Sequence, residues 1–399
     1  MASLLWSAGG GRRGPLVLMI ALVLALAPPT AAAEPLDAPE VTAASVFAYD
    51  VVTDETIYDV EADERRDMGS LAKIMTALVT LEHRAPDAEV VIGGADMVPA
   101  GYSAMWLQPG DTLTVEQLLT GVLVPSAGDA ALALARDVGA ELGGSDDPEI
   151  AVAAFVDAMN EQGAQLGLDD TRFANPVGED DDNAWSTARD IALLFGAAQE
   201  DERLSEIMAQ SDYGFVSVGP ERREYGGLST NELAGQLGVT GAKTGSTEAA
   251  GGCLVLSRTA NQNRNTVIVA LLGSNLVYDE TGIQIEDDRW TDATTLIEDM
   301  DEQWQWGQPK ADSALVQAAA EPAAPLATAP PDLAPDPALD AGFPQAGALP
   351  SQSVSPGTAA ATDDRPTVRE SFAIALAGGT VAIASGSTWV RLRATRLSA

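Results

Sequence analysis

The sequence of 399 residues lacks most of the side chains on which metal-dependent and thiol-dependent enzymes rely. Its single cysteine, Cys253, excludes a disulfide within the chain and a cysteine-rich zinc site. Its single histidine, His83, excludes the zinc motifs that require two histidines. Any catalysis by this chain is therefore expected to depend on serine, lysine and carboxylate side chains.

Basic residues are also scarce, with 22 Lys and Arg against 59 Asp and Glu, for a formal net charge of −37. Fifty of the acidic residues lie within residues 35–306. Phosphate recognition needs clustered Lys and Arg, so a nucleic-acid partner is excluded. We interpret the acidic surface as a feature of solubility or salt adaptation rather than a site for a cationic partner. The hydrophobic fraction of 46% suffices for one or two domains with extensions.

The N-terminus has the pattern of a secretion signal over residues 1–33. Arg12 and Arg13 precede an apolar run of 12 residues, Leu16 to Ala27, and small residues at 31–33 suit cleavage before Glu34. The apolar run is too short to span a hydrocarbon core of about 30 Å, so a signal peptide is favoured over a membrane helix. An uncleaved anchor is the alternative, and the arginine pair leaves a twin-arginine route open.

The C-terminal part has the composition of a linker followed by a membrane segment. Residues 307–369 contain eleven of the 23 prolines among Ala, Asp, Gly and Ser, which predicts a disordered linker. Within residues 370–399, Phe372 to Val390 are 19 residues without charge, followed by three arginines. This pattern favours a C-terminal transmembrane anchor with a basic cytoplasmic tail. A loosely associated or processed tail is the alternative.

Residues 34–306 are predicted to form one mixed α/β domain. Strands are expected near both of its ends, at 45–49, 56–60, 238–244, 253–257 and 266–272. Helices are expected between and after them, at 70–83, 115–123, 129–142, 149–166, from 188 onward and at 291–305. Strands at both ends of the sequence favour one antiparallel sheet, flanked by helices, in which N-terminal and C-terminal strands pair.

The first motif with chemical meaning is Ser70-Leu71-Ala72-Lys73. On a helix, positions i and i+3 share a face, so Lys73 can place its amine against the Ser70 hydroxyl. A serine at a helix N-terminus also lies near backbone N–H groups that stabilise an oxyanion. The alternative is a capping serine beside a solvated lysine.

The second motif, Lys243-Thr244-Gly245, continues as Ser246-Thr247 on an expected strand. Gly245 leaves room for a ligand, and the lysine with the two threonine hydroxyls suits a carboxylate. The chain has only three lysines, and two of them occupy these motifs. A buried lysine can lose its proton, whereas arginine cannot. The placement of the lysines therefore favours a catalytic role over that of solvent-exposed surface residues. The alternative is an edge strand with a surface lysine.

A third motif, Ser126-Ala127-Gly128, falls in a loop between two expected helices and is followed by Asp129. Ser126 could relay a proton between Lys73 and a leaving amine. The alternative is a helix N-cap, with Ser126 or Asp129 as the capping group.

Together and in this order, the motifs resemble the low-molecular-weight penicillin-binding proteins, the serine-type D-Ala-D-Ala carboxypeptidases. The resemblance is collinear over about residues 40–306 and includes further segments: 65–70, 75–78, 118–126, 173–178 and 186–190. It implies a fold similar to transpeptidases and β-lactamases, and it implies no cofactor.

The resemblance also implies a mechanism. Ser70 would attack the carbonyl between the two terminal D-alanines of a peptidoglycan stem peptide, and Lys73 would accept its proton. Ser126 would help pass that proton to the departing D-alanine, and water would release the acyl-enzyme. β-Lactam antibiotics would acylate Ser70 in the same way.

The same resemblance implies the binding groups. Backbone N–H groups of Ser70 and Ser246 would hold the oxyanion. The side chains of Lys243, Thr244 and Thr247 would bind the end of the substrate, with Gly245 leaving space for it.

Two positions depart from the family pattern. Gly128 stands where relatives carry an asparagine, and Asn275 stands where we expect an arginine that grips the terminal carboxylate. These departures leave two alternatives open. One is a sister enzyme, such as an endopeptidase, transpeptidase or β-lactamase, the last with Glu179 as the positional candidate for deacylation. The other is a catalytically weak wall-binding protein.

Overall fold

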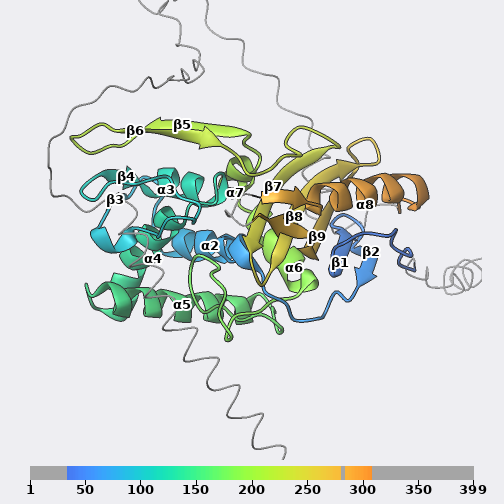
Figure 1. The fold of residues 1–399 in the computed structure, drawn as a ribbon, viewed down its shortest axis with the longest axis horizontal. Helices are drawn as coiled ribbons and strands as arrows, with labels where there is room; N and C mark the ends of the chain where they lie inside the picture. Colours follow the sequence, from blue (N-terminus) through green and yellow to red (C-terminus); the bar gives the residue numbers. More distant parts are fainter. Residues whose placement is uncertain (1–33, 280–283, 308–399) are drawn as a thin grey trace, which may run out of the picture. The chain divides into compact units, whose positions relative to one another are not determined.

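A computed structural model of the chain describes residues 34–279 and 284–307 (Figure 1). The expected signal peptide (1–33), the linker from residue 308 onward and the C-terminal segment (370–399) lie outside the described residues. Within residues 34–279 and 284–307, no helix has the length and apolar character needed to cross a membrane.

The centre of the fold is a five-stranded antiparallel sheet with the order β2-β1-β9-β8-β7. Its strands are β1 (Ser45–Asp50), β2 (Glu55–Val60), β7 (Val239–Thr247), β8 (Gly251–Ala260) and β9 (Asn265–Ser274). The predicted pairing of N-terminal with C-terminal strands is confirmed, because β1 lies between β2 and β9. Strand β7 is at the edge of the sheet, so one side of its backbone is available to the active site.

Both faces of this sheet are covered, which explains the nearly continuous apolar runs of β8 and β9. Side chains alternate across a strand, so Phe47 of β1 faces one core while its neighbours Val46 and Ala48 face the other. The larger core lies against the helices of the first two thirds of the domain. The smaller core lies under the last helix, α8 (Arg289–Gln303). Figure 1 shows α8 against the sheet, and also α6 (Ala188–Gln199), which belongs to the helical region described next.

The remaining helices form a helical region beside the sheet (Figure 1). They are η1 (Gly69–Ala72), α2 (Lys73–His83), η2 (Gly94–Asp96), α3 (Val115–Leu123), α4 (Gly128–Gly143), α5 (Pro148–Gln165), α6 (Ala188–Gln199) and α7 (Glu202–Met208). Each expected helix is present within a few residues of its predicted bounds. The helix expected from Ser70 differs in one respect: it opens with the 3₁₀ turn η1, and α-helical geometry begins at Lys73.

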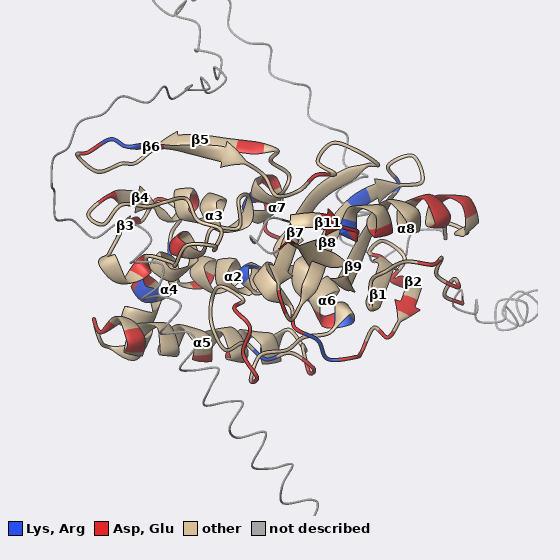
Figure 2. Cartoon of the chain, in the orientation of Figure 1, with Lys and Arg blue, Asp and Glu red and all other residues tan. Residues whose placement is uncertain are grey.

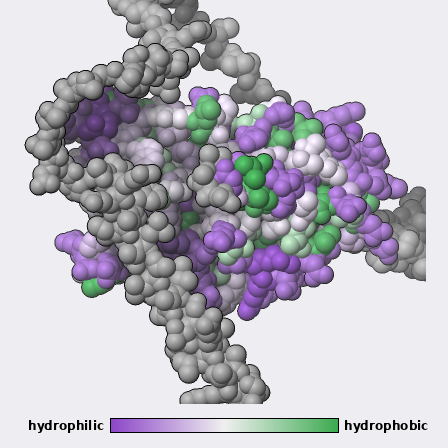
Figure 3. Space-filling view, in the orientation of Figure 1, coloured by the Kyte–Doolittle hydropathy of each residue, from purple (hydrophilic) through white to green (hydrophobic). Residues whose placement is uncertain are grey.

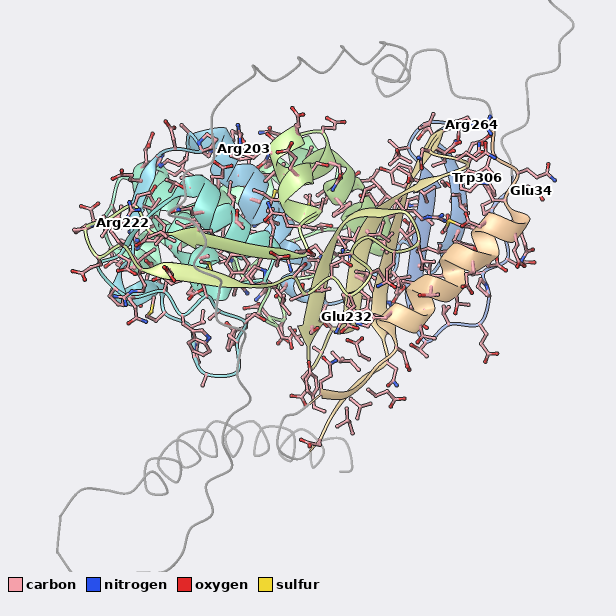
Figure 4. All side chains as sticks on the ribbon, turned by 90° about the horizontal axis from the view of Figure 1, so that it is seen from above. Glu34, Arg203, Arg222, Glu232, Arg264 and Trp306 are labelled. Atoms are coloured by element: carbon pink, nitrogen blue, oxygen red, sulfur yellow. The ribbon has the colours of Figure 1, made fainter. Side chains whose placement is uncertain are left out.

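Three small hairpins were not predicted from the sequence. They pair β3 (Glu89–Val91) with β4 (Thr112–Thr114), β5 (Asp212–Val216) with β6 (Glu224–Leu228), and β10 (Leu276–Tyr278) with β11 (Gln284–Asp287). Figure 4 labels Arg222, in the turn of the β5–β6 hairpin. These strands are short and largely exposed, so they lack the apolar alternation that identifies a half-buried strand.

The surface is acidic throughout the described residues. Figure 2 shows Asp and Glu spread over helices, strands and loops, with Lys and Arg in few places. The face seen in Figure 3 is mostly hydrophilic, with small apolar patches. The two buried lysines of the sequence motifs are exceptions to this surface pattern, because they lie inside the molecule.

Candidate active site

Ser70 and Lys73 meet at the junction of η1 and α2. The Lys73 Nζ donates to Ser70 Oγ at 2.8 Å and to the carbonyl oxygen of Val177 at 2.7 Å. Lys73 is only 3% exposed, and burial lowers its pKa to about 7, against a smaller opposing effect of the Asp129 charge. A lysine in this state can accept the serine proton near neutral pH.

The carbonyl that contacts Lys73 is held by a loop whose role the sequence analysis did not assign. Asn175 Oδ1 accepts hydrogen bonds from the backbone N–H groups of Val177, Gly178 and Glu179, at 3.2, 2.8 and 2.9 Å. Gly178 has φ +77°, and a Cβ there would lie 1.9 Å from the Gly69 carbonyl oxygen. Only glycine therefore allows this loop to lie directly on the turn that carries Ser70. The Phe173–Gly178 segment noted in the sequence contained this signal.

A second lysine–serine pair lies across the site. Lys243 Nζ, on β7, donates to Ser126 Oγ at 2.7 Å and to the Thr244 carbonyl oxygen at 2.7 Å. Lys243 is 1% exposed, and its pKa is well below the usual value because of burial first, then repulsion by Lys73 and Arg289. The hydrogen bond of Ser126 is thus to Lys243, whereas the sequence hypothesis considered Lys73 as its partner.

Ser126 is not a helix cap in the structure. The N-cap of α4 is Ala127, which makes no side-chain capping bond, and Ser126 has φ +64°. Asp129 instead accepts hydrogen bonds from the backbone N–H groups of Met105, Leu107 and Ala130. The capping alternative for this motif is therefore wrong, and the loop conformation directs the Ser126 hydroxyl to the lysine of β7.

Glycines bring the turn of Ser70 against the edge strand β7. A Cβ at Gly245 would lie 2.6 Å from the Met68 carbonyl oxygen and 3.2 Å from Ser70 N. On the opposite side, Gly69 has φ +53°, and a Cβ there would lie 3.1 Å from Ser246 N. Both close approaches need glycine. They place the backbone nitrogens of Ser70 and Ser246 on neighbouring segments, as a site for an oxyanion requires.

The sequence analysis missed a functional candidate, Arg289, which opens α8. This side chain is 3% exposed and reaches the end of β7, where it donates to the Gly245 carbonyl oxygen and to Ser246 Oγ, both at 2.8 Å. Its Nε lies 2.6 Å from Asp287 Oδ1. The available signal was one basic residue directly after the acidic run Glu286 to Asp288, at the start of the last helix.

Asn275, which the sequence analysis set in place of a carboxylate-binding arginine, bonds to groups on other segments. Its backbone N–H donates to Thr42 Oγ1 at 3.0 Å, and its amide donates to Asp288 Oδ2 at 2.9 Å. The strand pair β10–β11 lies between β9 and α8, and the arginine that reaches β7 is Arg289, fourteen positions after Asn275.

The two threonines of the second motif differ in their contacts. Thr244 Oγ1 donates to Thr230 Oγ1 at 2.7 Å and stays in the cavity wall. Thr247 Oγ1 donates to Asp180 Oδ1 at 2.5 Å and accepts from Ala250 N at 3.0 Å. The Thr247 hydroxyl, which the sequence hypothesis directed at a substrate, is therefore already engaged by a carboxylate.

Two cavities adjoin Ser70. One of about 310 Å³ has Ser126, Thr244, Ser246 and Arg289 in its wall, together with Glu232, which Figure 4 labels. The other, of about 410 Å³, is lined by residues of helices, loops and β7, including Lys73, Tyr102, Gly128, Val177, Glu179 and Thr247. The first cavity has hydroxyls beside the buried Arg289, with Glu232 and the Arg289-paired Asp287 also in its wall, and the second is lined by the carboxylates of Glu179 and Asp180. In the described part of the chain, no group of three or more His, Cys, Asp or Glu side chains is placed to hold a metal ion.

Gly128 is the first residue of α4 and faces the second cavity. Its N–H donates to the Ser103 carbonyl oxygen at 2.8 Å. Its backbone is helical, so no left-handed conformation requires glycine here. A Cβ would lie 3.0 Å from Val98 Cγ1, which is a tight but side-chain-only contact.

Comparison with known proteins supports the sequence resemblance. Residues 30–275 match a family model described as D-alanyl-D-alanine carboxypeptidase. The Escherichia coli carboxypeptidase DacC is 34% identical over 255 residues, which are 61% of this chain and 60% of that protein. This chain thus aligns with less than two thirds of that relative's length. A carboxypeptidase from Streptomyces sp. strain K15 is 33% identical over 269 residues, 65% of this chain and 89% of the relative.

A solved structure has the same fold. The crystal structure of the Streptomyces K15 DD-transpeptidase superposes with a TM-score of 0.58 at 31% identity, over 66% of this chain and 98% of that chain. The predicted fold class, a mixed α/β domain with an antiparallel sheet flanked by helices, is confirmed in the described domain. The family model covers more than half of the sequence, and on that ground the chain belongs to the D-alanyl-D-alanine carboxypeptidase family.

Proposed function

We propose that this protein is a serine-type D-Ala-D-Ala carboxypeptidase that removes the terminal D-alanine from peptidoglycan stem peptides. The observation that carries the proposal is the 2.8 Å hydrogen bond between Lys73 Nζ and Ser70 Oγ, with the pKa of that lysine lowered to about 7 by burial. This arrangement supplies a nucleophile and its base without histidine or metal.

In the acylation step, Ser70 Oγ attacks the carbonyl carbon between the two D-alanines while its proton passes to Lys73 Nζ. The tetrahedral oxyanion lies near the backbone nitrogens of Ser70 and Ser246. The C–N bond then breaks, and the leaving amine takes a proton from the Ser126 hydroxyl, which Lys243 supports. Ser126 is reprotonated by the proton that Lys73 took from Ser70, so Lys73 is neutral again. Water attacks the resulting ester and gives a proton to Lys73, and when the ester C–O bond breaks Lys73 returns that proton to Ser70 Oγ, which releases the shortened peptide.

The substrate carboxylate fits the smaller cavity. The hydroxyls of Thr244 and Ser246 line it, and Arg289 lies directly behind Ser246. Because Arg289 donates to Ser246 Oγ, the hydroxyl proton of that serine is free to turn toward a bound anion. Lys243 adds a second buried amine on the same side, and besides burial the nearby charge of Arg289 contributes to lowering its pKa. A terminal carboxylate would offset that repulsion, which favours substrates that end in a free carboxyl group.

A DD-transpeptidase is the second candidate, because the K15 structure that superposes on this chain carries that description. Both activities share the acyl-enzyme and differ only in whether water or an amine takes the acyl group. The distinction can be measured by adding an amine acceptor and comparing the hydrolysed with the transferred product.

The experiment that tests the proposal combines mass and product analysis. Intact mass of the purified protein with benzylpenicillin should increase by one β-lactam per chain. A pentapeptide ending in D-Ala-D-Ala should release one D-alanine per tetrapeptide formed, measured by chromatography. An unmodified mass together with no D-alanine release would reject the acyl-serine mechanism.

We also propose that the protein acts outside the cytoplasmic membrane, exported by residues 1–33 and anchored by residues 370–399. The apolar run at 16–27 and the uncharged stretch at 372–390 support this. Fractionation of cells that express the full chain or a chain ending at residue 369 tests the anchor. Recovery of both chains in the same soluble fraction would reject it.

A further inference from the structure

A strained and exposed aromatic residue lies next to the proposed catalytic cleft. Trp106 has φ +60° and is 64% exposed. A left-handed backbone is unfavourable for a bulky side chain, and such outliers persist only where the surrounding structure enforces them. A large hydrophobic ring in water at a strained position serves neither the core nor the backbone. We therefore searched its surroundings for what holds it and what it faces.

The turn that displays Trp106 is anchored on both sides. The two oxygens of the buried Asp129 carboxylate accept hydrogen bonds from the N–H groups of Met105 and Leu107, each at 3.0 Å. Both neighbours are buried, and the Trp106 carbonyl oxygen accepts a hydrogen bond from Gln108 Nε2 at 2.9 Å. One carboxylate therefore holds the residues before and after the tryptophan, and the ring is left projecting into solvent.

This turn is continuous with the cleft. Ser103, three residues earlier, lines both cavities that adjoin Ser70. Three extended residues span at most about 11 Å, so the backbone of Trp106 lies within that distance of a residue in the cleft wall. Asp129 also belongs to the segment that carries Ser126 and Gly128. The same buried carboxylate thus joins the catalytic loop to the tryptophan, which keeps their separation constant.

The chemistry of the site favours a sugar. A single exposed ring presents a flat apolar face that suits the C–H face of a pyranose, whereas a protein interface of ordinary size needs about 1,000 Å² or more with several anchors. The strongly acidic surface repels anionic polymers but not a neutral N-acetylated sugar. We infer that Trp106 is a stacking platform for a neutral amino sugar of the glycan chain to which the stem peptide is attached. The inference rests on the proposed function for the identity of that glycan.

The test compares Trp106→Asn with Trp106→Phe in the full chain. Asparagine tolerates the left-handed backbone and removes the ring, whereas phenylalanine keeps an aromatic face. Two substrates are used: a free pentapeptide ending in D-Ala-D-Ala, and the same peptide on an N-acetylglucosamine–N-acetylmuramic acid disaccharide. We expect Trp106→Asn to raise KM for the disaccharide substrate by about three- to tenfold while leaving the free peptide unaffected. Trp106→Phe, which keeps an aromatic face, should leave KM for the disaccharide substrate close to the wild-type value.

A second measurement does not need catalysis. Binding of a soluble N-acetylglucosamine oligomer is followed by calorimetry, and Trp106→Asn should weaken it while Tm stays the same or rises. The inference would be overturned if Trp106→Asn raised KM equally for both substrates, or for neither, or if it markedly lowered Tm. Trp106-dependent oligomer binding by a protein that releases no D-alanine would support the sugar site and reject the proposed carboxypeptidase activity instead.

Discussion

The two buried lysines of the site have nearly the same hydrogen bonds and different electrostatic surroundings. Lys73, in the helical region, contacts Ser70 Oγ and one carbonyl oxygen, and Lys243, on the sheet, contacts Ser126 Oγ and one carbonyl oxygen. Lys73 is influenced by the negative charge of Asp129, whereas Lys243 is influenced by the positive charges of Lys73 and Arg289. The hydrogen bonds of the two amines are therefore alike, and the neighbouring charges differ: burial lowers both pKa values, a negative charge opposes this for Lys73, and positive charges lower the pKa of Lys243 further.

This difference suggests a division of labour. The Lys243 side combines hydroxyls with the buried Arg289, and an arriving carboxylate would favour the protonated form of Lys243, which suits a group with negative charge. The Lys73 side has one cation that titrates near neutrality beside the nucleophile, which suits proton transfer. The predictions below test this division, and the largest expected effect comes first.

Removing the nucleophile should abolish covalent chemistry. Ser70→Ala lacks the attacking oxygen, so no β-lactam adduct should form, and D-alanine release should fall by about 10⁶-fold. Intact mass after incubation with penicillin measures the adduct. Ser211→Ala, which changes an exposed serine bonded to Asp212, is the control and should label as the wild type does. Persistent labelling of Ser70→Ala would place the nucleophile elsewhere.

Replacing each lysine by arginine should separate the two pairs. Guanidinium keeps the charge but cannot accept a proton at neutral pH, so Lys73→Arg should slow acylation by about 10²- to 10⁴-fold. Lys243→Arg keeps the charge and the donors on the binding side, so the expected loss is about tenfold. Rates of penicillin acylation, with Tm as the check on folding, decide the comparison. Equal losses in two folded variants would contradict the division of labour.

Restoring an amide at Gly128 should increase turnover. A missing donor to a buried carbonyl costs about 1–3 kcal/mol, or about 5- to 150-fold in rate when the contact forms in the transition state. Gly128→Asn should recover part of this, because the helical backbone there accepts any side chain. The tight contact of the new Cβ is with Val98 Cγ1, at 3.0 Å, while the Ser103 carbonyl oxygen lies at an ordinary 3.5 Å. The double variant with Val98→Ala removes that contact.

Steady-state kinetics on a D-Ala-D-Ala peptide compares these two variants with the wild type. No gain in kcat/KM in either folded variant would show that the site has been rebuilt around glycine.

The pH profile should report Lys73 directly. Its neutral form is the base, and its pKa is lowered to about 7, so acylation should rise with pH through about 7 and then level off. Asp129→Asn removes a charge that raises this pKa, so the midpoint should move to lower pH. Asp137→Asn, a change in the ion pair with Arg84, is the control and should leave the midpoint in place. A move of the Asp129→Asn midpoint to higher pH would contradict the assignment.

Much of the fold was predictable because its strongest sequence signals come from local patterns and from strands that are buried on both faces. Strands β8 and β9 carry uninterrupted apolar runs, since the helices cover one face and α8 covers the other. Hairpin β5–β6 was missed because Gly214, Gly226 and Gly227 interrupt its alternation and it remains exposed. Exposed hairpins depend on backbone pairing rather than on burial, so composition reveals them poorly.

In the site, the sequence by itself determined the Ser70–Lys73 pair, because a spacing of three on a helical turn places both side chains on one face. It also excluded a disulfide within the chain and zinc motifs that need several cysteines or two histidines. Only the tertiary structure decided that Ser126 bonds to Lys243, 117 residues away, and that Arg289 rather than Asn275 reaches β7. The tertiary structure also buries both lysine side chains away from solvent. Contacts between distant segments and the burial that shifts a pKa depend on how the whole chain packs, which local spacing does not encode.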